Sequence, residues 1–257
     1  MGTSTRWSGP RGRTGTAGEW SRVTGRLGSW RPDRADADQV LDDIAADHVR
    51  VLHRTLRADP SAFGLYEIVC AAGERLASAL GVLAESGPVG ADSTDAFLAR
   101  FAGEVGGDGG TLAEAAVRRA AASAAQRLLD HLQTDGDPAG GLGGLAGDLL
   151  CLLYRWFFAD AVAEFLRAVV AEQVRLAVPL PPALDPEDRI PEWVAGHVLR
   201  LVPSPCEEAA YLSAGSDTAE AGVDGSAGPL PEIARTLVPR SAGRVLGLIT
   251  DDGEEAA

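Results

Sequence analysis

The sequence predicts an all-α fold: an irregular multi-helix bundle around one long central helix, with a disordered basic N-terminal arm and a flexible C-terminal tail. The central helix is predicted from residues 148–178, which contain neither proline nor glycine. Apolar residues recur at helical spacing on both sides of this segment, and no alternating pattern of any length indicates a β-strand. Together these observations favour helices throughout.

The predicted central helix changes character along its length. Its first half is apolar on all sides, as in Trp156 and Phe157, which is typical of a helix that is buried all round. Its second half has an apolar stripe through Val162 and Phe165 and a charged opposite side. Because charged residues interrupt the whole segment, it never offers the roughly 20 apolar residues that a membrane span needs. We therefore expect no transmembrane segment.

Composition divides the chain into four parts. Residues 1–35 are predicted to be a disordered arm rich in Arg, Trp and Gly, and residues 36–213 the helical bundle domain. Residues 214–228 are predicted to be a disordered linker, and residues 229–257 short amphipathic helices with an acidic tail.

Three of the five tryptophans lie in the predicted arm, at Trp7, Trp20 and Trp30. One interpretation is a basic and aromatic arm that contacts an acidic partner, a membrane surface or nucleic acid. The alternative is that translation starts downstream, so that the arm is not part of the protein in the cell.

Charge is distributed unevenly. The net charge is −14, but residues 1–34 hold seven arginines and two acidic residues, so the rest of the chain carries −19. An acidic body repels phosphate backbones, and we do not expect the folded part to bind nucleic acid. All 23 basic residues are arginine and there is no asparagine, which a GC-rich bacterial genome explains. Lysine-dependent chemistry is thereby excluded.

Local signals place several helix ends. Asp36 with Gln39, and Thr111 with Glu114, have the spacing of a capping box. The sequence Asp59-Pro60 is predicted to begin the second helix directly. Later in the chain, Pro186 and Pro191 are predicted to begin two separate short helices. Small residues also recur four apart in the second helix, which predicts a close helix neighbour there: Gly73, Ala77 and Gly81.

Three cysteines lie far apart in the sequence, at Cys70, Cys151 and Cys206. An odd number without CxxC spacing predicts reduced, buried thiols rather than a disulfide or a zinc site. The N-terminus carries arginines but no apolar segment of the kind found in secretory signals. We therefore expect a cytoplasmic protein.

A short acidic run is the first candidate for chemistry. Asp42, Asp43 and Asp47 lie about one helical turn apart, a spacing that can hold Mg²⁺ against a diphosphate. Such sites need a second acidic group facing the first, and no matching run is visible. Acidic residues at a helix start also favour the helix dipole, so the structural alternative is a solvated helix start.

The central helix supplies the second candidate. Arg155 lies between Tyr154 and Trp156, and Asp160 follows after two phenylalanines. If these residues are buried, the guanidinium needs a carboxylate or an aromatic face. The functional hypothesis is a ligand or partner site formed by Arg155, Trp156 and Asp160. The structural alternative is an ion pair where two helices cross.

The C-terminal segment carries a third set of candidates. Apolar residues there have the spacing of a docking helix, and they are Ile233, Leu237, Leu246 and Ile249. Such a segment either binds a groove on another protein or folds back onto its own bundle. Folding back is favoured because an exposed apolar surface is otherwise a liability.

The sequence contains no HExxH, P-loop or GxSxG motif, and no cofactor is expected. The hypothesis that remains is a non-catalytic helical interaction or adaptor module in a bacterial multiprotein assembly or signalling system, with a protein partner. The alternative is a small-molecule-binding helical regulator, or a helical enzyme, with a pocket around Arg155.

Overall fold

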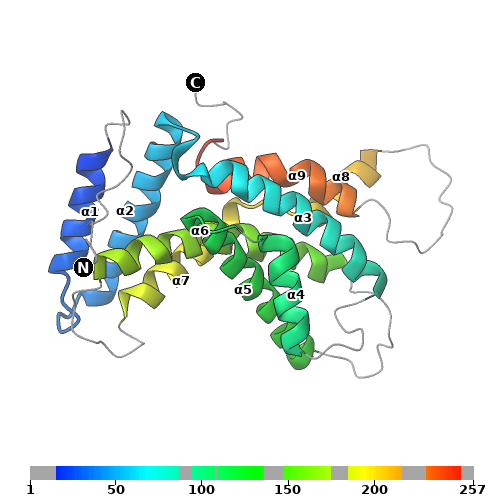
Figure 1. The fold of residues 1–257 in the computed structure, drawn as a ribbon, viewed down its shortest axis with the longest axis horizontal. Coiled ribbons are helices and arrows are strands. Elements are labelled where there is room, and N and C mark those ends of the chain that lie inside the picture. The colour runs from blue at the N-terminus through cyan, green and yellow to red at the C-terminus, as the bar shows by residue number, and fades with distance from the viewer. Residues whose placement is uncertain are drawn as a thin grey trace.

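The computed structural model describes residues 16–86, 94–107, 109–135, 147–174, 185–215 and 230–249. In these ranges no residue lies in a β-strand, and the all-α prediction is confirmed (Figure 1). The helices, in chain order, are α1 (Ala17–Ser29), α2 (Ala37–Ala58), η1 (Ala62–Gly64), α3 (Leu65–Ser86), α4 (Thr94–Gly106), α5 (Leu112–Asp135), α6 (Gly147–Val174), α7 (Pro186–Val198), η3 (Leu199–Leu201), α8 (Pro205–Gly215) and α9 (Leu230–Val245).

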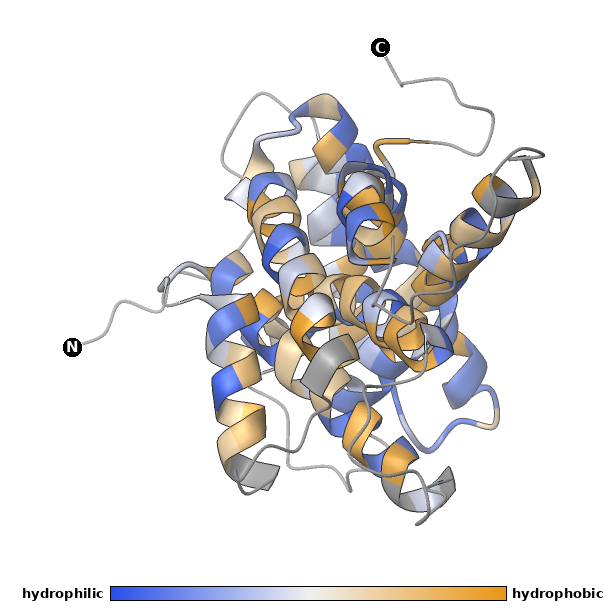
Figure 2. Cartoon of the chain, turned by 90° about the vertical axis from the view of Figure 1, so that its right-hand side faces the viewer, coloured by the Kyte–Doolittle hydropathy of each residue, from blue (hydrophilic) through white to orange (hydrophobic). Residues whose placement is uncertain are grey.

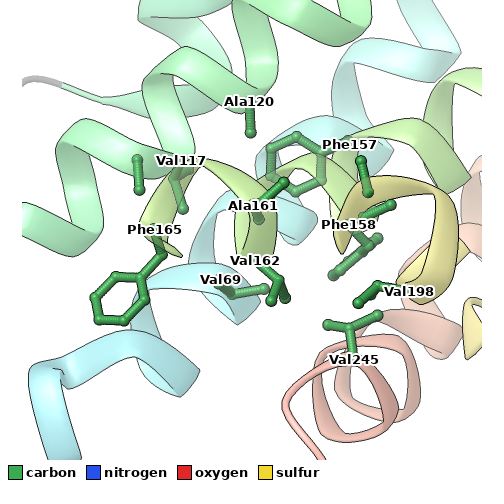
Figure 3. Packing of buried hydrophobic residues seen from close by; sticks show 14 of the residues in the cluster. Val69, Val117, Ala120, Phe157, Phe158, Ala161, Val162, Phe165, Val198 and Val245 are labelled. Carbon is green, nitrogen blue, oxygen red and sulfur yellow. The ribbon is translucent and has the colours of Figure 1, made fainter. Parts of the chain in front are cut away.

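The long helix α6 lies at the centre, as predicted, and contacts α3, α5, α7 and α9. Its aromatic residues Phe157, Phe158 and Phe165 are fully buried. Figure 3 shows them among side chains from the surrounding helices, including Val69 of α3 and Val245 of α9. The outer helices instead show alternating hydrophilic and hydrophobic bands, as amphipathic helices do (Figure 2). A helix that is apolar on every side is thus covered on every side.

Helix α1 corrects the prediction of a disordered arm. Residues 17–29 are helical, and α1 packs beside α2 (Figure 1). Trp20 is only 1% exposed, and its indole Nε1 donates to Thr55 Oγ1 at 3.0 Å. Trp30 is also buried and donates to the Ala37 carbonyl at 2.9 Å. The prediction rested on average composition, which hid an apolar stripe at helical spacing. Trp7 lies outside the described residues.

One of the two predicted capping boxes is confirmed and the other is wrong. The capping box at Thr111 is confirmed, because Glu114 Oε2 accepts from the Thr111 N–H at 2.8 Å and Thr111 Oγ1 accepts from the Glu114 N–H at 3.2 Å. The Asp36 box is wrong, since that carboxylate pairs with Arg34 instead. The second helix begins later than predicted, at Leu65, after a break where Phe63 has a φ of 65°.

Pro191 does not begin a helix of its own, because α7 runs continuously from Pro186 to Val198. A proline inside a helix has no N–H to offer to the carbonyl four residues earlier, which here belongs to Glu187. That carbonyl accepts a hydrogen bond from Arg167 Nη1 of α6 at 3.0 Å. A side chain from the central helix therefore supplies the donor that the proline lacks.

The C-terminal helix α9 packs along α3 and returns to the bundle (Figure 1). Ile233, Leu237 and Leu246 are buried in this chain, and the half-buried Ile249 packs over Gly243. The helix ends in a Schellman motif, with the Leu248 N–H donating to the Gly243 carbonyl at 2.8 Å and Gly247 at a φ of 70°. The segment after the predicted linker is thus part of the core.

His53 of α2 holds the end of α9. Its Nε2 donates to the Val245 carbonyl at 3.0 Å, and Arg57 Nε donates to the Gly247 carbonyl at 2.6 Å. In the sequence, Arg50, Arg54 and Arg57 surround His53 and predict a polar helix face. Instead burial, followed by the charge of Arg57, lowers its pKa to about 4, although the bond to Val245 acts in the opposite direction. A neutral imidazole therefore joins two helices that are far apart in sequence.

The predicted reduced thiols are contradicted by a disulfide between Cys151 of α6 and Cys206 of α8. Cys70 is half-buried and unpaired. The two bonded cysteines are 55 residues apart in the sequence, and only the packing of α8 against α6 brings them together. Within the described ranges, no helix is long and apolar enough to cross a membrane.

Replacing Gly73 with alanine should destabilise the protein. A Cβ at this position would lie 2.8 Å from both Phe158 Cζ of α6 and Val238 Cγ1 of α9. Overpacking of this kind costs about 1–3 kcal/mol. Gly103→Ala in α4 is the matched control, because its Cβ would meet nothing within 4 Å and should stabilise by about 0.5–1 kcal/mol. Urea unfolding of both variants measures the difference, and equal changes would contradict the proposed close approach.

Candidate functional site

An open groove lies between α2 and α7 and has a volume of about 740 Å³. The two helices pack against each other, and α7 supplies most of the lining. The lining residues on α7 and η3 are spaced three or four apart, which places them on one helix face. The groove is lined by Asp42, Arg189, Glu192, Trp193, Gly196, His197 and Arg200.

An ordered aromatic stack forms the middle of this groove. The rings of Trp193 and His197 are parallel within 8°, with centroids 4.8 Å apart. Arg200 Nη2 donates to His197 Nδ1 at 3.1 Å, so that nitrogen is an acceptor and carries no proton. Burial, followed by the charge of Arg200, lowers the pKa of His197. The stack is therefore held neutral and in one orientation.

Charges of both signs surround the stack. Arg189 at one end pairs with Asp38 of α2 at 3.3 Å. Arg200 at the other end is exposed and forms no ion pair within the described part of the chain. Asp42 and Glu192 add carboxylates to the lining. A binding partner thus meets an aromatic surface, an available guanidinium and two carboxylates.

The three predicted metal ligands do not converge. Asp47 forms ion pairs with Arg26 of α1 and with Arg50. Asp43 accepts a hydrogen bond from Gln39 at 3.3 Å, and Asp42 faces the groove instead. Across the described ranges, no group of three His, Cys, Asp or Glu side chains is placed to hold a metal ion. The geometry gives the magnesium hypothesis no support.

Arg155, Trp156 and Asp160 do not form one site. Trp156 contacts His131 of α5 edge-on, with ring centroids 6.5 Å apart. Asp160 also faces α5, where its Oδ1 pairs with Arg127 Nη2 at 3.0 Å. Arg155 lies on another side of α6 and donates from Nη2 to the Leu199 carbonyl at 3.2 Å. The structural alternative, an ion pair at a helix crossing, therefore describes Asp160.

The Asp160 carboxylate is nearly inaccessible, at 2% exposure, and its Oδ2 has no hydrogen-bond partner in the described part of the chain. Burial raises its pKa from the ordinary value of 3.8 to about 6, although the nearby Arg127 acts in the opposite direction. Because the folded state holds the proton more tightly, stability falls as the pH rises from about 4 to about 6 and is constant above that. Ionised Asp160 therefore costs stability at neutral pH.

Asp160→Asn should remove this pH dependence. The difference between pKa values of 3.8 and about 6 corresponds to about 3 kcal/mol at neutral pH. The unfolding free energy of the variant minus that of the wild type should fall by about 2 kcal/mol between pH 7.5 and pH 4.5. The subtraction is essential, because buried His53, whose pKa is lowered, makes stability fall as the pH drops over the same range.

The control for this measurement is Asp130→Asn, which changes an exposed carboxylate on α5. Urea unfolding at both pH values gives the free energies. A difference for Asp160→Asn that changes with pH no more than that for Asp130→Asn would show that Asp160 is ionised as easily in the folded protein as in the unfolded chain.

Arg155 lines a second, smaller cleft of about 340 Å³ beside the disulfide. Its Nε is buried without a hydrogen-bond partner among the described residues. The cleft lies between α6 and the start of α8, and its lining is Asp148, Cys151, Leu152, Arg155, Ser204, Cys206 and Glu207. The pocket around Arg155 that the sequence suggested thus has a counterpart, although with different neighbours.

The α7 groove is not among the candidate sites that the sequence predicts. The available signal was a spacing of three to four residues through Arg189, Trp193, His197 and Arg200, which puts an aromatic residue, an imidazole and two cations on one face. The prediction that Pro191 begins a separate helix is incompatible with this continuous face, because it divides α7 in two.

No protein-family model matches the chain, and the comparisons with curated proteins and with solved structures give no significant match.

Proposed function

We propose that this chain is a non-catalytic helical interaction module of a bacterial assembly or signalling system, and that the α7 groove is its contact surface. The observation that carries the proposal is the Trp193–His197 stack, held by Arg200 in an open groove. Tryptophan and arginine are the residue types that dominate protein–protein binding energy. A stack that is already ordered loses little conformational freedom on binding.

The chemistry of the groove indicates the kind of partner. The stack favours an aromatic or long aliphatic anchor, and exposed Arg200 favours a carboxylate close to that anchor. The volume and openness of the groove suit a protein segment laid along α7. We propose a protein segment with an apolar anchor beside an acidic residue as the partner, and the acidic body of the chain makes nucleic acid an unfavourable one.

A photo-crosslinking amino acid at Gly196 tests this proposal. Gly196 lines the groove and its Cβ would meet nothing within 4 Å, so a side chain there fits without repacking. In the native host, the crosslinker should capture one protein. Adding Trp193→Ala and Arg200→Ala should reduce that capture at least tenfold, which corresponds to about 1.4 kcal/mol of binding energy.

The control is Tyr211→Ala on α8, an aromatic residue that is 77% exposed and lies outside the groove. Capture should be unchanged in this variant. If the same protein is captured equally with and without the two groove substitutions, the contact lies elsewhere. Point variants are used because deleting the C-terminal segment would remove α9, which is part of the core.

A second candidate function is binding of a small anion at Arg155. It is favoured by the cleft of about 340 Å³ and by the buried Nε that has no partner in the described residues. Native mass spectrometry of protein purified from the host should then show a bound molecule that Arg155→Gln removes. A ligand retained by this variant would contradict binding at Arg155.

We also propose that the protein is cytoplasmic. A disulfide that persists in a reducing cytoplasm is unusual, and such bonds there are generally transient, catalytic or redox-sensing. Alkylation of free thiols in intact cells, followed by mass spectrometry, measures how much of the Cys151–Cys206 pair is oxidised.

A further inference from the structure

The Cys151–Cys206 disulfide lies in the wall of the Arg155 cleft, not in the closed core. Its two sulfur-bearing residues differ in access. Cys151 is 4% exposed, whereas Cys206 is half-buried and is the second residue of α8. Cys206 is therefore the more accessible of the two residues to a thiol that enters the cleft.

Charges of both signs surround the two thiolates that reduction produces. Cys206 is the second residue of α8, whose N-terminus is capped by Ser204 accepting from the Glu207 N–H at 3.4 Å. Helix N-termini and nearby arginines stabilise thiolates. Arg155 follows Cys151 by four residues on α6 and lies on the same face. Asp148 and Glu207 line the same cleft and oppose this effect, so the balance between these charges sets the rate.

Helix α8 packs against both α6 and α9, but few of its side chains are buried there. Of its described side chains only Pro205 is buried, while Tyr211 is 77% and Leu212 is 51% exposed. The apolar surface that usually holds a helix in place is therefore small here. The disulfide is a principal attachment of α8 to the central helix.

We infer that Cys206 is a site of thiol–disulfide exchange with a low-molecular-weight thiol that enters the Arg155 cleft, and that this exchange releases α8 from α6. In the first step a thiolate attacks Cys206 Sγ. A new S–S bond forms, the bond to Cys151 breaks, and Cys151 leaves as a thiolate that takes a proton from water. A second thiolate then attacks the outer sulfur of the mixed disulfide and releases Cys206. Two external thiols are oxidised to one disulfide as the protein disulfide is reduced.

This inference concerns a site separate from the α7 groove, so it can fail without affecting the proposed function. The low-molecular-weight thiol is chosen because the cleft, at about 340 Å³, has the size of a small-molecule site. The dithiol of a reductase protein could carry out the same exchange. The second experiment below distinguishes it from a low-molecular-weight thiol.

The first test compares the two cysteines one at a time in full-length protein with Cys70→Ala. Cys151→Ser leaves only Cys206, and Cys206→Ser leaves only Cys151. Oxidised glutathione should modify the first variant at least tenfold faster than the second, as followed by intact-mass measurement. Adding Arg155→Gln to the Cys206→Ser variant should slow modification of Cys151 several-fold near neutral pH, and less at high pH. Equal rates for the two cysteines would overturn the inference.

The second test does not depend on these variants folding. Reduction of the wild-type disulfide by dithiothreitol should be first order in dithiothreitol at all concentrations, because attack occurs on the folded protein. A rate that becomes independent of dithiothreitol would mean that the bond is reached only after unfolding, and would contradict the inference. A thioredoxin-type dithiol that acts faster than glutathione at equal thiolate concentration would identify a protein as the reductant.

Release of α8 is measured by hydrogen–deuterium exchange. Reduction and alkylation should increase exchange in residues 205–215 at least tenfold more than in α6, where the increase reports the loss of global stability. Unchanged α8 would show that it is held without the disulfide. An increase in α8 no larger than that in the rest of the chain would show that α8 opens only when the whole fold does, and either result would overturn the release of α8.

Discussion

Replacing Trp20 with alanine should lower the free energy of unfolding by about 3–5 kcal/mol, the usual cost of removing a large buried aromatic side chain. Trp20 is 1% exposed, contacts His48 with ring centroids 6.3 Å apart, and donates to Thr55 Oγ1. Removing the indole leaves a cavity between α1 and α2. It also leaves the buried Thr55 hydroxyl with one hydrogen bond fewer. Such a loss is a large fraction of the stability of an ordinary domain.

Chemical unfolding followed by circular dichroism measures this effect. Tyr211→Ala is the control, because Tyr211 is the most exposed large aromatic residue in the described part of the chain, and its loss should change stability by at most about 0.5 kcal/mol. If Trp20→Ala behaved like Tyr211→Ala, α1 would not be an integral part of the bundle, and residues 17–29 would again be best described as an arm.

Removing the disulfide should lower the free energy of unfolding by about 2–4 kcal/mol. The loop between Cys151 and Cys206 spans 55 residues, and the chain-entropy estimate for a loop of this length is about 4 kcal/mol. The cross-link stabilises the fold chiefly by reducing the conformational entropy of the unfolded chain. This contribution to the free energy of unfolding does not depend on which cysteine reacts first with a thiol. The Cys151→Ala/Cys206→Ala double variant is the direct test.

A comparison with reductant isolates the covalent contribution. Dithiothreitol should reduce the unfolding free energy of the wild type to that of the double variant and have no effect on the variant itself. Cys70→Ala is the matched control, because Cys70 is half-buried and outside the disulfide. Dithiothreitol should lower the unfolding free energy of this variant as much as it lowers that of the wild type. A wild type whose stability is the same with and without reductant would contradict a stabilising role for the bond.

The candidate site was only partly accessible to sequence reasoning. Arg155 and Asp160 were grouped because they are close in the sequence and both are polar in an apolar helix. Five residues of an α-helix amount to about 500° of rotation, which leaves the two side chains on different sides. Asp160 therefore meets Arg127, and Arg155 meets η3.

The sequence by itself determined the helical class, the central position of α6, the capping box at Thr111 and the close approach at Gly73. Each of these follows from local rules, such as the period of apolar residues, the residue types at helix ends and the size of a side chain. The burial of α9 was also indicated, because a strongly apolar stripe needs a surface to cover it.

Only the tertiary structure decided which distant residues meet. The Cys151–Cys206 bond, the contact of His53 with the end of α9, and the groove between α2 and α7 each join segments far apart in the chain. Spacing in a sequence records the period of one helix, but not the angle at which two helices cross or the face that remains uncovered. For that physical reason the elements were predictable, whereas the groove at Trp193 and the pairing of Cys206 with Cys151 beside Arg155 were not.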